Sequence, residues 1–270
     1  MDRTLGSEGT LSVVVFGDDA AAVRDADLGD RAEVAVEAVE GARVEPALDR
    51  LSEADLVVPS GEEAFLSLAR REVEKPILPV DGGQGIASVR AGALGTAIDE
   101  VQAGAYSIRA LPGIAVRADG DRYRGVMDVM AVTAEAAKIS EYQIASLDDG
   151  DEVVLDRIRA DGVVAAAPAG TPGYGTAAGG PVLDPALDAM AVIPVGPFRI
   201  EHTHWVLELP ISLTVVREEV PVSLQVDDRE VGTLEAGTAV EIAWGTPMDI
   251  VVTSVSGGGL RPHGSDRDGG

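Results

Sequence analysis

At 270 residues, of which 46% are hydrophobic, the chain can bury a sizeable core in one large or two moderate domains, and this composition excludes an intrinsically disordered protein. The absence of cysteine excludes disulfide bonds, thiolate nucleophiles and zinc sites with cysteine ligands. Its 46 acidic and 21 basic residues give a net charge of −25, which argues against nucleic acid and anionic membranes as partners.

The charged residues are unusual in their types as well as in their net charge. Lys75 and Lys138 are the only lysines, and all other basic residues are arginines. We interpret this acidic, lysine-poor composition as halophilic, because high salt screens the self-repulsion of such a surface. The alternative, an acidic surface that selects a basic partner, is weaker because the acids are spread over the whole chain. No apolar stretch approaches the roughly 20 residues that span a bilayer, and we expect a cytoplasmic protein.

Residues 11–106 alternate short apolar runs with helical patterns, which predicts an α/β domain with a Rossmann-like parallel sheet. Residues 1–10 before it are polar and are expected to be disordered. Strands are expected at Leu11 to Phe16, Arg43 to Val44, Leu56 to Val58 and Ile77 to Val80. Helices are expected at Asp18 to Ala26, Glu45 to Glu53, Glu62 to Glu74 and Thr96 to Ala103.

The pattern changes after about Tyr106, and residues 107–255 read as an all-β domain. Turn signals such as Asp149-Gly150 and Asp227-Asp228 separate extended, often alternating segments. These are Ile108 to Ala118, Arg122 to Thr133, Ile139 to Leu147, Glu152 to Ile158, Trp205 to Leu209, Leu213 to Arg217, Val222 to Val226, Val240 to Ala243 and Ile250 to Ser254. Residues 256–270 have the composition of a disordered tail.

The most informative segment runs from Asp161 to Pro181. A short apolar strand from Val163 to Ala167 leads into a loop with five glycines, three prolines and one aromatic residue, Tyr174. Small residues gather this densely where something must approach the backbone closely. A further apolar strand follows, within the run that ends in Pro194-Val195-Gly196-Pro197.

This loop resembles the nucleotide loop of the NAD kinase family, which reads roughly T-P-T-G-S-T-A-Y-x-x-x-A-G-G-P. The chain departs from the pattern at its first and third threonines, which fall on Ala167 and Pro172. It matches at Pro168, Gly170, Thr171, Tyr174, Ala178, Gly179, Gly180 and Pro181. The α/β unit followed by a β-rich unit is also the domain order of that family.

The family's phosphate motif, G-G-D-G-T-F-L, falls on the segment from Ser60 to Leu66, which reads S-G-E-E-A-F-L. The resemblance implies that Gly61 contacts the nucleotide and that Glu62 supplies the acid near the ribose hydroxyl. Glu63 places a bulky anion where the family has a glycine, and Ala64 removes a hydroxyl. Without the family, the same residues predict a helix start capped by Ser60, with two acids favouring the helix dipole.

Other positions of the family's site are kept in part. Its Asn-Asp or Asn-Glu pair, which holds ribose and adenine, falls on Met127-Asp128, so the acid is kept and the amide is lost. A lone Asp in an apolar strand is costly to bury unpaired, which itself favours a ligand site at Asp128. The family's turn after the next strand meets Asp81 to Ile86, where a loop that merely closes the sheet is the favoured interpretation.

Tyr174 either stacks on a nicotinamide or adenine ring or anchors the loop against the core. Arg159 and Asp161 occupy positions that contact the nucleotide in the family, although Asp161-Gly162 is also an ordinary turn pair. His202 and His204 share a strand face, but no third ligand accompanies them, so we expect a surface pair and no metal site of this kind.

The resemblance implies a NAD kinase-like fold and transfer of a phosphoryl group from ATP or polyphosphate to the 2′-hydroxyl of NAD, giving NADP. It also implies Mg²⁺, NAD(H) as substrate and a homo-oligomeric assembly, dimer or tetramer. The main alternative is an impaired paralogue that binds nucleotide without catalysis, and a lipid kinase fits poorly. The predicted site comprises Glu62 as catalytic acid or base and Gly61, Asp128, Arg159, Asp161, Gly170, Thr171, Tyr174, Gly179 and Gly180 as nucleotide-binding residues.

Overall fold

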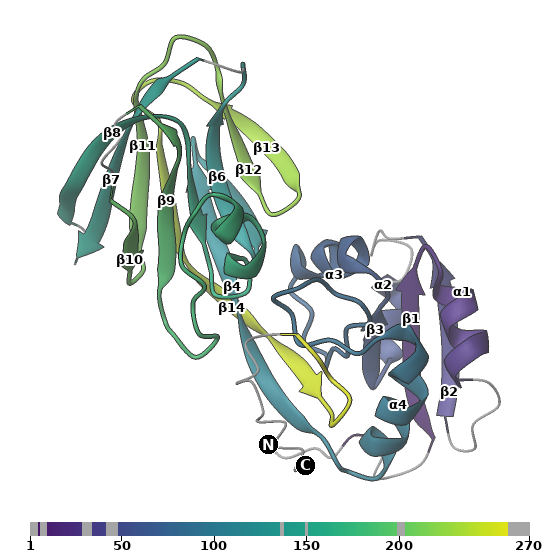
Figure 1. Cartoon of the computed structure of the whole chain (residues 1–270). Coiled ribbons are helices and arrows are strands. Elements are labelled where there is room, and N and C mark those ends of the chain that lie inside the picture. The colour runs from purple at the N-terminus through teal and green to yellow at the C-terminus, as the bar shows by residue number, and fades with distance from the viewer. Residues whose placement is uncertain are drawn as a thin grey trace, which may run out of the picture.

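The computed structural model places an α/β domain beside a larger β-domain, and two long strands run from one to the other (Figure 1). It describes residues 5, 10–28, 34–41, 48–135, 138–148, 151–198 and 203–258. Several predicted features lie outside these ranges: most of the N-terminal segment 1–10, the strand at Arg43 to Val44, the start of the helix at Glu45, His202, and the tail from residue 259 onward.

The α/β domain is built on a parallel sheet, as predicted. Its strands are β1 (Leu11–Gly17), β2 (Val34–Glu40) and β3 (Leu56–Pro59), in the order β2-β1-β3. The central strand is an almost continuous apolar run because both of its faces are covered. The sequence did not predict β2, since its Ala- and Glu-rich residues suit a helix as well as an edge strand.

Helices cover both faces of this sheet. Val14 and Phe16 of β1 pack with α3, whereas Val13 and Val15 pack with α4 on the other side. The helical elements are α1 (Ala20–Val23), η1 (Arg24–Leu28), α2 (Leu48–Glu53), α3 (Glu62–Ala69), η3 (Ala91–Ala93) and α4 (Leu94–Gln102). Helix α3 therefore ends five residues before the predicted Glu74. The predicted strand at Ile77 to Val80 forms only isolated bridges, because prolines at 76 and 79 lack the N–H that a ladder needs.

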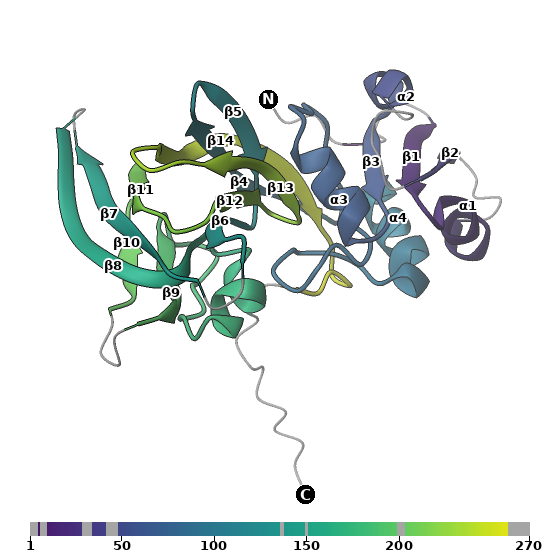
Figure 2. The same cartoon turned by 90° about the horizontal axis from the view of Figure 1, so that it is seen from above.

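The β-domain is a strongly curved, largely antiparallel sheet that wraps around its own core (Figure 2). Within the described residues its main path runs β13-β12-β6-β8-β7-β11-β14-β4-β5, and β9 pairs with β8 and β10. The strands are β4 (Ser107–Ala118), β5 (Asp121–Gly125), β6 (Asp128–Thr133), β7 (Ser140–Asp148), β8 (Asp151–Ala166), β9 (Met190–Pro197), β10 (Trp205–Leu207), β11 (Ile211–Arg217), β12 (Val222–Val226), β13 (Arg229–Leu234) and β14 (Ala239–Val252).

Several of these strands differ from the sequence-based prediction: β13 was not predicted, and the segment Arg122 to Thr133 forms two strands, β5 and β6. Strand β8 is continuous through Asp161-Gly162, so the turn considered there does not form. Gly162 instead allows β8 to pack closely against neighbouring β6, because a Cβ at this position would lie 2.7 Å from the carbonyl oxygen of Ala131. Strand β14 was predicted as two segments, and it is one strand with a register shift between Gly245 and Met248.

Strands β4 and β14 also join the two domains. Near the end of β14, Ile250 bridges to Ile77 of the α/β domain, the Ile77 amide donates to the Asp249 carbonyl at 2.8 Å, and the Val251 amide donates to the Ile77 carbonyl at 2.7 Å. Val251 is buried in the same core cluster as helix α4. Paired backbone and a shared core therefore hold the domains against each other. Among the described helices, none is long and apolar enough to cross a membrane.

Candidate functional site

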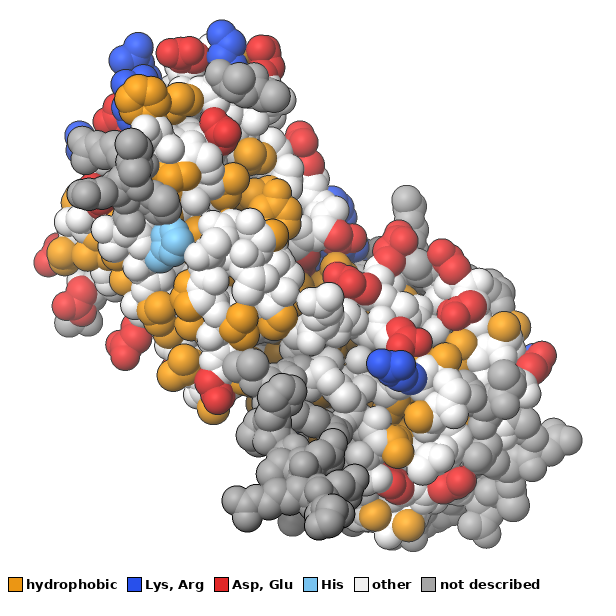
Figure 3. Space-filling model, viewed as in Figure 1, with side chains coloured by type: hydrophobic (Ala, Val, Ile, Leu, Met, Phe, Trp, Pro, Cys, Tyr) orange, Lys and Arg blue, Asp and Glu red, His pale blue; other side chains and the backbone are white. Residues whose placement is uncertain are grey.

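A cleft of about 540 Å³ lies at the seam between the two domains. The α/β domain contributes the start of α3 and the loop at residues 84–85, and the β-domain contributes the glycine-rich loop, the start of β6 and the turn between β12 and β13. Acidic side chains are visible along this seam in the space-filling view (Figure 3). Segments that are far apart in sequence therefore build one site.

The glycine-rich loop is held rigidly against the body of the β-domain. The Thr171 side chain is fully buried: its Oγ1 donates to the Pro168 carbonyl at 2.9 Å and accepts the Leu183 amide at 3.1 Å. A Cβ on Gly170 would lie 2.1 Å from the Met127 carbonyl oxygen, and one on Gly180 would lie 2.4 Å from Cδ1 of Ile193. What approaches these glycines is the protein itself, and Thr171 fixes the loop rather than facing the cleft.

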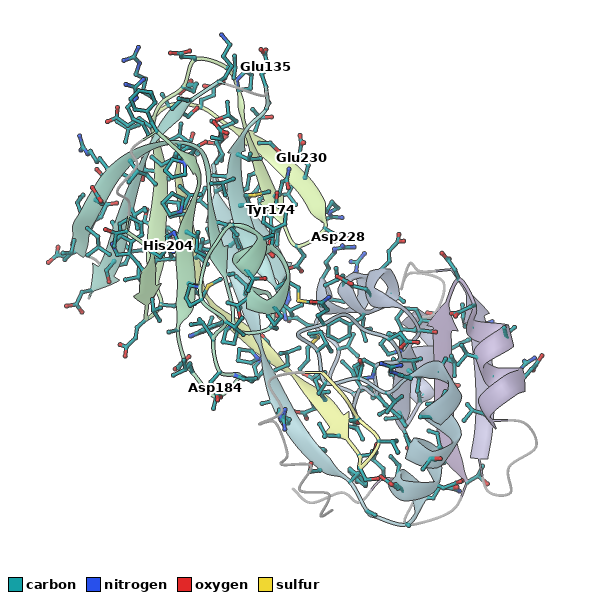
Figure 4. All side chains as sticks on the ribbon, viewed as in Figure 1. Glu135, Tyr174, Asp184, His204, Asp228 and Glu230 are labelled. Carbon is teal, nitrogen blue, oxygen red and sulfur yellow. The ribbon has the colours of Figure 1, made fainter. Side chains whose placement is uncertain are left out.

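Tyr174 stands out from this loop at the edge of the cleft (Figure 4). Its side chain is 49% exposed, so the ring is not anchored in the core. Of the two interpretations made from sequence, this position favours a ring that is free to stack on a planar ligand. Gly173 beside it also lines the cleft, and a Cβ there would meet no atom within 4 Å.

Glu62 is the first residue of α3 and lies on the opposite side of the cleft. It is exposed, and its carboxyl carbon would lie 3.1 Å from a Cβ on Gly83, so it packs over the neighbouring turn. Gly61 is the N-cap, with φ 90°, and α3 has no side-chain cap. The alternative in which Ser60 caps the helix is wrong, because its hydroxyl donates to the Asp19 carboxylate at 2.8 Å.

Asp128 begins β6 and faces the same cleft from the β-domain. Its carboxyl is largely buried, and burial, with a further contribution from the nearby charge of Asp227, raises its pKa to about 7. Near neutral pH a substantial fraction of Asp128 therefore carries a proton and can donate a hydrogen bond as well as accept one.

Asp227 is a cleft residue that the sequence analysis did not identify as part of the site. Its carboxylate accepts the backbone amides of Met127 at 2.8 Å, Val126 at 3.1 Å and Asp128 at 3.2 Å. Burial raises its pKa, while these amides and the charge of Arg70 act in the opposite direction. In the sequence, Asp227-Asp228 signalled only a turn, because the amides that it binds lie about a hundred residues earlier.

Six of the predicted site residues do not line this cleft: Gly61 and Thr171, described above, and four that lie further away. Arg159 is exposed, with its guanidinium 5.5 Å from the Phe198 ring centre. Asp161 lies on β8, where its Oδ2 would be 2.4 Å from a Cβ on Gly196. Gly179 and Gly180 lie at the far end of the loop, beside residues His204 and Ile193. The structure brings together Glu62, Asp128, Gly170 and Tyr174 in the cleft lining, but not these six.

The cleft is strongly acidic. Its lining includes Glu62, Asp128, Asp227 and Asp228, and no lysine or arginine among the residues that the structure describes. Arg70, at the end of α3, forms an ion pair with Asp228 beside it. An anionic ligand in this cleft therefore meets repulsion that bound cations or a high salt concentration would have to offset.

Parts of this chain are similar in sequence to known NAD kinases. Residues 128–247 match the family model of the ATP-NAD kinase C-terminal domain. The NAD kinase of Methanosarcina mazei is 36% identical over 88 residues, covering 33% of this chain and 29% of that protein. The NAD kinase of Methanopyrus kandleri is 27% identical over 188 residues, covering 67% of this chain and 63% of that protein. Together with the M. mazei protein, the NAD kinases of Methanosarcina acetivorans and Methanosarcina barkeri align with this chain over only about a third of their own length. The covered shares are 29%, 30% and 35%.

Solved structures agree at the level of the fold. Yeast NADH kinase complexed with NADH superposes with a TM-score of 0.73 at 17% identity, covering 92% of this chain and 85% of that chain. An NAD kinase from Archaeoglobus fulgidus in complex with ATP gives 0.69 at 22% identity, covering 90% and 94%. The fold is thus that of the NAD kinases, and residues 128–247, in its β-domain, carry the match to the ATP-NAD kinase C-terminal domain.

Proposed function

We propose that this protein is a NAD kinase-like phosphotransferase that moves a phosphoryl group from ATP or polyphosphate to the 2′-hydroxyl of NAD. The observation that carries the proposal is the cleft itself, in which Glu62 of one domain faces Asp128 and Tyr174 of the other. Tyr174 would stack on a ring of the dinucleotide, and Asp128 would hydrogen-bond a ribose hydroxyl. The predicted cytoplasmic location, halophilic character and homo-oligomeric state remain predictions.

The chemistry assigned to Glu62 is general-base catalysis. Its carboxylate takes the proton of the 2′-hydroxyl, the hydroxyl oxygen forms a bond to the terminal phosphorus of the donor, and the bond from that phosphorus to the leaving phosphate oxygen breaks. Phosphoryl transfer depends mainly on positioning and on neutralising charge. The protein's contribution is therefore to hold the acceptor and Glu62 in register across the seam.

The residues of the cleft are compatible with a Mg²⁺ that enters with the donor phosphates. Among the described residues, no group of three or more His, Cys, Asp or Glu side chains could hold a metal by itself. Mg²⁺ needs only one or two carboxylates when phosphates supply its other ligands. Asp227 is engaged by backbone amides and Asp228 by Arg70, so Glu62 is the exposed carboxylate that could hold this ion, as its alternative role in place of the general base. When bound, the ion would offset negative charge in the cleft.

The second candidate, a nucleotide-binding protein without catalysis, rests on Glu63 and Ala64. Glu63 adds an exposed anion to the first turn of α3, and Ala64 is buried without a hydroxyl, at the positions where the family motif has Gly and Thr. Both changes weaken the phosphate half of the site more than the half that contains Tyr174 and Asp128.

The decisive experiment measures NADP formation from NAD with ATP or polyphosphate, in molar KCl with Mg²⁺, alongside the dissociation constant for NAD. We expect Glu62→Gln to lower the rate at least about 100-fold, as loss of a general base does, with little change in NAD affinity. Glu63→Gln is the matched control, since it removes the same charge one residue away and should keep or raise the rate. A wild-type protein that binds NAD but makes no NADP would favour the second candidate, and one that binds no NAD would contradict both.

A further inference from the structure

We propose that the turn between β12 and β13, through Asp227 and Asp228, is a positioning element that fixes the two halves of the cleft relative to each other. The consequence for catalysis rests on the proposed function, whereas the structural coupling does not. Asp227 organises the strand end that carries Asp128, and Asp228 holds the helix that carries Glu62. Neither residue is assigned chemistry of its own.

The first half of the coupling is a carboxylate bound by consecutive backbone amides. Oδ1 of Asp227 accepts the amides of Val126, Met127 and Asp128, and Oδ2 accepts the amide of Val126 as well, at 3.1 Å. In return, the Asp227 amide donates to the Asp128 carbonyl at 2.9 Å. These contacts fix the backbone just before β6, and with it two residues that line the cleft, Met127 and Asp128.

The backbone around Asp227 is shaped for this contact. Asp227 adopts a positive φ of 54°, which Asp tolerates better than most residues. On the facing segment, Gly125 leaves space for the turn, because a Cβ there would lie 2.6 Å from Cγ1 of Val226 and 2.9 Å from both carboxylate oxygens of Asp227. A substitution at Gly125 can therefore displace the carboxylate without changing it.

The second half of the coupling reaches the other domain. Arg70 is the C-cap of α3, and its guanidinium pairs with Asp228 at the tip of the turn, where Figure 4 places Asp228 next to α3. Glu62 begins the same short helix, so a shift of one end of α3 is transmitted to the other. The Arg70 and Asp228 side chains are 19% and 39% exposed, and a pair this accessible contributes little to stability. Its main effect is on geometry.

The Asp227 carboxylate and the Arg70–Asp228 ion pair should affect different steps. Removing the Asp227 carboxylate should loosen the acceptor side of the site and weaken NAD binding. Removing the Arg70–Asp228 pair should leave NAD binding largely intact but displace Glu62, which lowers kcat. A residue that only stabilised the fold would lower the melting temperature without separating these two quantities.

The test compares Asp227→Ala, the conservative Asp227→Asn and Gly125→Ala, with Gly92→Ala as control because a Cβ at Gly92 meets no atom within 4 Å. Hydrogen exchange of the Val126, Met127 and Asp128 amides should accelerate at least tenfold in Asp227→Ala and Gly125→Ala, and less in Asp227→Asn, which keeps one oxygen acceptor. The dissociation constant for NAD should rise about 10- to 100-fold, with larger increases in Asp227→Ala and Gly125→Ala than in Asp227→Asn. Exchange rates and affinity that match those of Gly92→Ala would overturn the proposal.

The domain coupling is tested with Arg70→Ala, Asp228→Ala and the double variant. Each single variant should lower kcat about tenfold with the NAD dissociation constant changed less than threefold, and the double variant should be no worse than either, because both remove one interaction. Additive losses, or unchanged kcat, would overturn this half. If the wild-type protein binds no NAD, the proposed function fails, but amide exchange in Asp227→Asn and Gly125→Ala still decides whether the carboxylate holds the strand.

Discussion

Asp128 is the residue whose chemistry depends most on its surroundings. The sequence showed a single acid in an apolar strand, and in the structure that acid lies close to a second carboxyl, Asp227, with a pKa raised to about 7 by burial and by the charge of Asp227. Because the folded state binds this proton more tightly than the unfolded chain, the contribution of Asp128 to stability is greatest below its unfolded pKa of 3.8. This contribution is lost as the pH rises from there to about 7.

We therefore predict that Asp128→Asn stabilises the protein at pH 8, by at most about 4 kcal/mol, and has little effect near pH 4. The measurement is the melting temperature between pH 4 and pH 8 at constant salt. The exposed Asp188 provides the control Asp188→Asn, which should follow the wild-type curve. Parallel curves for wild type and Asp128→Asn would show that Asp128 titrates normally.

Among the elements, the glycine-rich loop shows how a correct sequence signal can have an unexpected structural cause. The density of small residues predicted close approach to the backbone, which holds, but the approaching groups at Gly170 and Gly180 are the Met127 carbonyl and the Ile193 side chain. A sequence cannot distinguish a ligand from a neighbouring strand, because both demand the absence of a Cβ. Only the fold shows which loop residues line the cleft, Tyr174 and Gly173 among them.

At this scale we predict that Gly170→Ala destabilises the fold by about 1–3 kcal/mol, because the added methyl would have to displace the backbone of Met127. Urea denaturation measures this difference. Gly92→Ala, where the space is open, should change the free energy of unfolding by less than about 1 kcal/mol. Equal midpoints for Gly170→Ala and wild type would contradict the tight contact between loop and strand.

Over the whole molecule, the net charge of −25 acts on every element at once. Salt shortens the range of this repulsion, from about 10 Å at 0.1 M to about 3 Å at 1 M. The acidic cleft has the same need for screening before it can admit phosphates. Stability and ligand binding should therefore respond to ionic strength in the same direction.

We predict that the melting temperature rises by several degrees between 0.1 M and 2 M KCl, since screening relieves the self-repulsion of the folded state. Differential scanning calorimetry gives the value, and sucrose at matched osmolality is the control because it is excluded from the surface without screening charge. A similar rise in KCl and in sucrose would mean that repulsion between surface charges is not what limits stability.

The sequence alone predicted the α/β and all-β composition of the chain and the glycine-rich loop, because periodicity, turn residues and composition are local properties. The resemblance to the NAD kinase family made Glu62 a candidate acid and supported Asp128. Tertiary structure decided which of the predicted residues meet. It brought Asp227 to amides about a hundred residues away, and it placed Asp161 and Arg159 on β8 away from the cleft. Such pairings depend on strand register and on how two domains pack across a seam, and neither is encoded within a short window of residues.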